Sequence, residues 1–207
     1  MSGTITVNGT GSASGSPDLA TVNLGVEIVG RSVAEARVKA AADAAAVIAA
    51  LRKHGIQGSD LKTSAYGIHP EYDHRDGRRL RGYRITNTLE AVVRDLSSVG
   101  SVVDAAAAAA ADSTVVHSLS FGFEDSRGLD EEARQAAWDD ARRRAQQLAD
   151  LAGVGLGRAA SIVEQTYSAP QPAMRAMAME AAVETPIEAG QHSITVTINV
   201  EFRIENS

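Results

Sequence analysis

The sequence predicts an α+β fold in which antiparallel or mixed sheets pack against three helices. Several segments alternate apolar and polar residues with period two, as half-buried strands do. Three other segments carry small apolar residues at helical spacing. Together they give the order β-β-α-β-β-α-β-α-β-β, which is loosely two copies of a β-α-β-β unit without a sequence-level repeat. We expect residues 1–207 to form one domain.

The first two strands are expected over residues 4–8 and 20–28. Ile5 and Val7 alternate with polar residues in the first, and the second alternates over its whole length. The Gly/Ser-rich stretch 9–17 between them predicts a turn or bulge. A phosphate-binding loop is disfavoured there because a second strand follows the glycines, whereas a phosphate loop needs a helix N-terminus.

Alanine-rich helices are predicted over residues 32–53, about 96–111 and 129–152. Ser32 and Glu35 have capping-box spacing in the first, and the second ends in the alanine run 105–111. Because alanine buries little area, we expect thin helix–sheet packing, so that subunit contacts supply part of the stability. The residues expected to face the sheet from the third helix are Leu129, Ala133, Ala137, Ala141, Ala145, Leu148 and Ala152.

A long hairpin is predicted from strands 61–72 and 83–94, joined by a polar loop over residues 73–81. Further strands are expected over 115–123, 156–167 and 193–204. His117 falls on the apolar face of the first of these and is interpreted as a core histidine. His69 and His74 lie on the hairpin, where alternation points them to opposite faces and argues against a shared metal.

Composition excludes several function classes. There is no cysteine, which rules out disulfides, thiolate nucleophiles and cysteine-ligated metals. The net charge of −6 disfavours nucleic acid as a partner. No apolar run is long enough to predict membrane insertion, and no catalytic motif or cofactor-binding motif is present. We therefore predict no catalytic residues, no cofactor and no metal.

Two segments are candidate interaction surfaces. The hairpin tip carries Arg75, Arg78, Arg79 and Arg81, a cluster that a subunit contact or solvent explains better than RNA because acidic neighbours dilute its charge. The Pro/Met-rich excursion, residues 168–191, carries Met174, Met177 and Met179. These methionines suit a partner or the protein's own core, and Cu(I) binding through thioethers is a weaker alternative.

Motifs spread along the whole chain resemble those of the SIMPL-domain family. This family groups bacterial periplasmic or outer-membrane-associated antigens with a eukaryotic protein that binds an interleukin-receptor-associated kinase. The matching segments are Val7-Asn-Gly9-Thr-Gly11, Pro17-Asp18-Leu-Ala20, Gly55-Ile56, Asp60-Leu61-Lys-Thr63, Pro70-Glu-Tyr72, Asp95-Leu96 with Gly100, Ala145 to Gly157, Pro170-Gln-Pro172-Ala-Met174 and Thr185-Pro186-Ile187-Glu188-Ala-Gly190.

The resemblance implies an α+β subunit and, as in characterised bacterial relatives, a large ring-like homo-oligomer. It implies no established enzymatic activity, and it makes Pro17, Asp18, Gly55 and Pro186 structural markers. We therefore expect a non-enzymatic, self-assembling scaffold or interaction module whose partners are itself or another protein. A small-ligand-binding protein or enzyme gated by residues 168–191, and a stress-related metal-binding protein, are the alternatives.

The N-terminal residues read as a strand and not as a signal peptide. The sequence therefore predicts a cytoplasmic protein if the chain is native from Met1. A periplasmic or extracellular location is predicted if a signal peptide has been removed.

Overall fold

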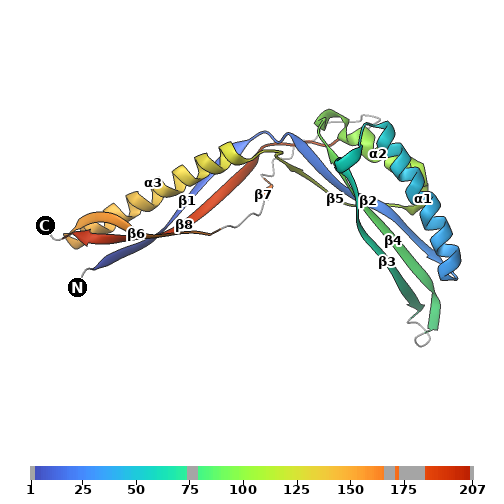
Figure 1. Cartoon of the computed structure of the whole chain (residues 1–207), viewed down its shortest axis with the longest axis horizontal. Helices are drawn as coiled ribbons and strands as arrows, with labels where there is room; N and C mark the ends of the chain where they lie inside the picture. Colours follow the sequence, from blue (N-terminus) through green and yellow to red (C-terminus); the bar gives the residue numbers. More distant parts are fainter. Residues whose placement is uncertain (1–2, 74–78, 166–170, 173–184, 206–207) are drawn as a thin grey trace. The chain divides into compact units, whose positions relative to one another are not determined.

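A computed structural model describes residues 3–73, 79–165, 171–172 and 185–205. These residues divide into two compact units (Figure 1). Unit 1 contains residues 3–17, 123–165, 171–172 and 190–205, and unit 2 contains residues 18–73, 79–122 and 185–189. The assignment of residues 1–207 to a single domain stays a prediction.

The predicted α+β class and the predicted order of elements are confirmed, with one short strand added before the last. The chain forms β1 (Thr4–Gly15), β2 (Leu19–Gly30), α1 (Val33–Lys53), β3 (Leu61–Asp73), β4 (Arg79–Val93), α2 (Val99–Ala110), β5 (Thr114–Gly122), α3 (Arg127–Ala152), β6 (Gly155–Gln165), β7 (Gln171–Pro172) and β8 (His192–Glu205). Short 3-10 turns precede β3 and flank α2.

Both sheets are antiparallel, and each contains a strand-helix-strand-strand unit with the same strand order. In unit 2, the chain passes through β2, α1, β3 and β4, which lie in the order β3-β4-β2, with β5 beside β2. In unit 1, it passes through β1, α3, β6 and β8, which lie in the order β6-β8-β1. The second arrangement is interrupted in sequence, because all of β2 to β5 is inserted between β1 and α3.

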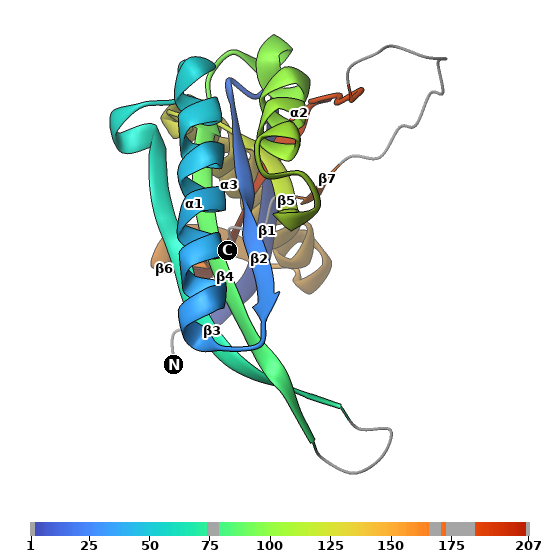
Figure 2. The ribbon, with the colours of Figure 1, turned by 90° about the vertical axis from the view of Figure 1, so that its right-hand side faces the viewer.

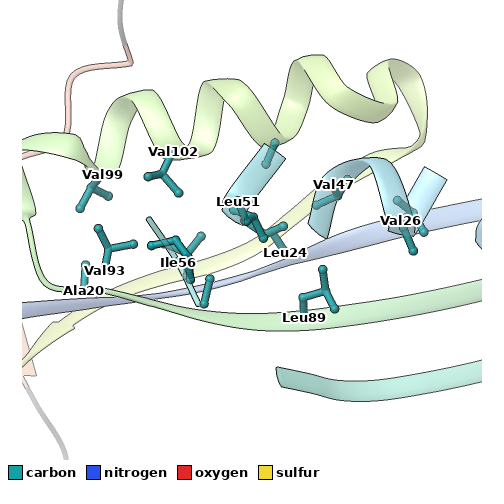
Figure 3. Close-up of a cluster of buried hydrophobic side chains, with 14 residues drawn as sticks. Ala20, Leu24, Val26, Val47, Leu51, Ile56, Leu89, Val93, Val99 and Val102 are labelled. Carbon is teal, nitrogen blue, oxygen red and sulfur yellow. The ribbon is translucent and has the colours of Figure 1, made fainter. Parts of the chain in front are cut away.

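The core of unit 2 is aliphatic. Helices α1 and α2 cover one face of its sheet, and Figure 3 shows Val47 and Leu51 of α1 and Val102 of α2 on the side of the sheet from which Leu24 of β2 and Leu89 of β4 project. All five side chains are buried. Ser32 caps α1 as predicted, since its hydroxyl accepts a hydrogen bond from the Glu35 amide at 3.2 Å.

Unit 1 packs one helix directly onto strand backbone. A methyl group at Gly9 would lie 2.1 Å from the Ala137 carbonyl oxygen, and one at Gly11 would lie 2.2 Å from the Ala137 nitrogen. The glycines are therefore the contact surface of α3 and belong to β1, which runs without a break to Gly15. The prediction of a turn or bulge over residues 9–17 was wrong for residues 9–15, which belong to β1; close helix packing and not chain reversal is the reason for Gly9 and Gly11.

The inner face of α3 is an unbroken row of alanines. Ala133, Ala137, Ala141, Ala145 and Ala149 are all fully buried. The prediction that Leu148 and Ala152 face the sheet was wrong. Leu148 is 46% exposed, and Ala152 is exposed as well. A helix lying along a strand keeps a strict four-residue row against it, and Leu148 falls one position off that row.

The assignment of His117 to the core was also wrong. Asn23 of β2 pairs with Ser118, but Leu24 pairs with Val116, so His117 is the extra residue of a β-bulge in β5. A bulge shifts the side-chain alternation by one residue, and His117 is exposed on the face opposite the helices. There its Nε2 atom lies 3.5 Å from the Thr88 hydroxyl.

Candidate interaction site

Strands β3 and β4 continue beyond the rest of their sheet. The pairing of β2 with β4 ends at Gly30 and Tyr83, after which residues 71–73 pair only with residues 79–82. We call these two segments the arm. Figure 2 shows the arm running past the end of α1. The arm is therefore a ribbon of two strands that β2 does not join.

Two of the predicted interaction residues lie on the arm. Arg79 and Arg81 are exposed. Both belong to β4, so the prediction of a loop through residue 81 was wrong. Arg81 is the extra residue of a bulge, because Glu71 pairs with Gly82 and Tyr72 pairs with Leu80. Polar residues extend the strand here because the backbone pairing of β3 with β4 continues past the rest of the sheet.

The other predicted interaction residues lie outside the described part of the chain. They are Arg75, Arg78, Met174, Met177 and Met179. Their role as an interaction surface stays a prediction.

A charged cluster joins three strands at the root of the arm. Arg84 of β4 donates two hydrogen bonds of 2.9 Å to the Glu71 carboxylate of β3. Its remaining nitrogen donates to Glu27 of β2. All three side chains are about one-third exposed. The Arg84 guanidinium therefore bridges the carboxylates of two neighbouring strands and stabilises the sheet. Its role differs from that of the exposed Arg79 and Arg81.

Beside this cluster, apolar side chains are exposed on β3, at the edge of the sheet, and on the arm segment of β4. Tyr66 is 53% exposed, Ile68 41% and, on the arm, Leu80 48%. Ile68 pairs with Ile85, which is buried against α1, yet Ile68 itself lies one strand further out than the helix reaches. The sequence predicts the strand, but its alternation could not show that β3 is the outermost strand.

The returning end of the Pro/Met-rich excursion is attached to α2. The Asp104 carboxylate accepts hydrogen bonds from the Thr185 amide, at 3.1 Å, and from the Thr185 hydroxyl, at 2.6 Å. These bonds lower the pKa of Asp104. Because Gly100 has no side chain, the Thr185 carbonyl oxygen can approach α2 closely. Ile187 packs against the aliphatic core. Gly100, Thr185 and Ile187 lie in motifs that are visible in the sequence, but their contacts depend on the tertiary fold.

The described residues bring together no group of three histidine or acidic side chains placed to hold a metal ion. Within the same residues, no helix has the combined length and apolar character needed to cross a membrane.

Comparison with known proteins supplies the family. The family model named SIMPL, described as a protein of unknown function (DUF541), matches residues 5–202. The chain belongs to the SIMPL family. It is 32% identical to the 26 kDa periplasmic immunogenic protein of Brucella melitensis, over 97% of this chain and 84% of that protein. It is 31% identical to the uncharacterized protein YggE of Escherichia coli K12, over 97% of this chain and 80% of YggE.

Several SIMPL motifs have structural roles in this chain. Gly9 and Gly11 admit α3 to β1, and the Asp18 amide donates to the Gly122 carbonyl at 3.1 Å. Gly55 has a φ of 86° and follows the end of α1, a conformation that a residue with a side chain rarely adopts. These motifs therefore mark the SIMPL fold.

Proposed function

We propose that this SIMPL protein is a non-enzymatic, self-assembling interaction module. The observation that carries the proposal is the apolar outer edge of β3, formed by Tyr66 and Ile68, with Leu80 of β4 exposed nearby on the arm. In the strand order β3-β4-β2-β5, the outward backbone groups of β3 have no strand partner among the described residues. An edge that is both apolar and unpaired favours association with another strand.

A second copy of the chain is the occupant we propose for this edge. The arm adds exposed Arg79 and Arg81 next to the apolar residues, and the chain as a whole has a net charge of −6. The two exposed guanidinium groups can attract carboxylates on the surface of another copy. The alanine-built core of unit 1 gives such contacts a further role, since they would add buried area.

We place this module in the periplasm. The name of the Brucella relative describes that protein as periplasmic. This supports the periplasmic alternative over the cytoplasmic one.

Light scattering during size-exclusion chromatography tests self-assembly. The wild-type chain is expected to have a mass well above the 21.6 kDa of one copy. Ile68→Glu should move the mass toward 21.6 kDa, because it places a charge on the proposed contact edge. Circular dichroism would verify that the variant keeps its fold.

Val38→Glu is the matched control for that experiment. Val38 is a 66% exposed residue on α1, away from the β3 edge, so the same charge there should leave the assembly intact. A wild-type monomer at micromolar concentration would refute self-assembly. An Ile68→Glu protein that assembles as the wild type does would refute the β3 edge as the contact.

A further inference from the structure

Unit 1 contains a cavity of about 370 Å³ between α3 and β6. One wall is a single face of α3, formed by Trp138, Arg142 and Gln146. The opposite wall is β6 from Leu156 to Ala159, and the buried ring of Phe202 on β8 forms the floor. This volume lies within the range of small-molecule sites.

The cavity follows from how the helix is placed. Gly9 and Gly11 hold α3 tightly against β1, which is the far strand in the order β6-β8-β1. The helix therefore covers β1 and β8 and leaves the β6 side of the sheet less covered. Register shifts between Leu156, Ala159 and Ser161 interrupt the regular pairing of β6 along the same stretch.

The cavity combines an aromatic surface with two cations. The Trp138 and Phe202 rings lie with centroids 5.8 Å apart. Arg142 reaches the cavity from α3 and Arg158 from β6. Gly157 and Glu205 also line the cavity, and a side chain at Gly157 would come within 2.9 Å of the Arg203 carbonyl oxygen.

The charges on α3 set Arg142 apart from its neighbours. Arg143 and Arg144 both pair with Asp140, and Arg134 pairs with Glu164. Among the residues that the structure describes, neither Arg142 nor Arg158 has a carboxylate within ion-pair distance. The two arginines that line the cavity are therefore available to an external anion.

We propose that this cavity binds a small monocarboxylate with an aromatic or branched apolar body. The guanidinium groups of Arg142 and Arg158 suit the carboxylate, because arginine forms paired hydrogen bonds with that group. The apolar body lies against Trp138 and Phe202. The carboxylate of Glu205, which also lines the cavity, disfavours a second negative charge on the ligand. This site is in unit 1 and does not depend on the proposed assembly through β3.

Titration with 3-phenylpropionate, monitored by tryptophan fluorescence and by the NMR signal of the indole N–H, tests the site on the intact chain. Trp138 is the only tryptophan in the sequence, so both signals report on this cavity. We expect saturable binding with a Kd on the order of 0.1–1 mM. The neutral 3-phenylpropionamide should bind at least about 10-fold more weakly, because it lacks the charge that the arginines recognise.

Variants complete the test. Arg142→Ala and Arg158→Ala should each raise the Kd about 10-fold, and the double variant should abolish the response. Arg143→Ala is the control, because Arg143 is on the same helix but pairs with Asp140. Equal affinity for acid and amide, unchanged affinity in the double variant, or no change in either signal up to about 10 mM ligand would each overturn the proposal.

Discussion

At the scale of single residues, glycine decides how unit 1 packs. A strand interior is normally weakened by glycine, which has no side chain to pack and loses more entropy on folding. Gly9 and Gly11 are nevertheless buried, because the backbone of α3 occupies the space of their missing side chains. The same positions that resemble a flexible connection in sequence are among the most constrained in the fold.

We predict that Gly11→Ala destabilises the protein by about 3 kcal/mol. The added methyl group would lie 2.2 Å from the Ala137 nitrogen and 2.3 Å from the Ala133 carbonyl oxygen, so the helix has to move. Urea unfolding measures the change. Gly128→Ala, on the first turn of α3 with no atom within 4 Å of the new methyl group, should be neutral or stabilising by up to about 1 kcal/mol. Equal stability of the two variants would contradict the close-packing explanation.

At the scale of elements, polar contacts attach α3 to the strand beneath it. The Asp140 carboxylate accepts a hydrogen bond of 3.1 Å from the Thr10 amide on β1. Arg144 and Arg143 also pair with Asp140. The Thr10 hydrogen bond is the main cause of a lowered pKa at Asp140, and the arginines add to it. The Asp140 carboxylate thus fixes the position of α3 along β1. The small alanine side chains constrain that position less.

We predict that Asp140→Asn lowers the melting temperature at pH 7, and that this difference narrows in acid. Because the folded-state pKa of Asp140 lies below the ordinary value of 3.8, its charge stabilises the fold at higher pH. That stabilisation is lost as the pH falls through the folded-state pKa. Thermal melts of both proteins from pH 7 to about pH 2 measure it.

Asp139→Asn is the control for the pH series. It removes a charge from the same turn, where Asp139 accepts hydrogen bonds from Gln135 and not from β1. A melting-temperature difference for Asp140→Asn that stays constant down to the lowest pH would show that its charge has no part in attaching α3.

At the scale of the whole molecule, the two units have cores of different composition. Unit 2 buries Leu24, Leu51 and Leu89, whereas the helix side of unit 1 is the alanine row. Stabilisation from burial scales with the apolar area removed from water, at about 25 cal/mol per Å². An alanine row therefore contributes less than a leucine-based interface of the same length, even when its packing is close.

We predict that amides in α3 exchange with solvent faster than those in α1 and β2, by about 10-fold or more. A difference of about 1.4 kcal/mol in local opening free energy is sufficient for that ratio. Hydrogen exchange followed by mass spectrometry at peptide resolution measures it. Slower exchange in α3 than in α1 would show that close backbone packing compensates for the smaller buried area.

Much of the fold could be predicted from the sequence because local chemistry specifies it. The Ser32 cap, the alternation of β2 and β8, and the left-handed Gly153 after α3 all depend on nearby residues. The wrong predictions concern residues whose environment is set by segments distant in the sequence. Gly9 and Gly11 depend on a helix more than a hundred residues away, and His117 depends on a register shift against β2.

The candidate site was only partly predictable for the same reason. The arginines of the hairpin are visible as a charge cluster, and two of them lie on the exposed arm. The apolar edge of Tyr66 and Ile68 was missed, because a strand's alternation is the same at the edge of a sheet as at its centre. The cavity beside Trp138 has no sequence signal, since its lining comes from three elements.

The sequence by itself determined the class, the order of the elements, the Ser32 cap of α1 and the family. Those features depend on residue spacing over a few turns or on motifs along one chain. Only the tertiary structure decided that β1 and β2 enter different sheets, that β3 is an outer edge, and that α3 lies over β1 and leaves a cavity beside β6. These depend on backbone pairing and close approach between distant segments, which the spacing of residues along the chain does not encode.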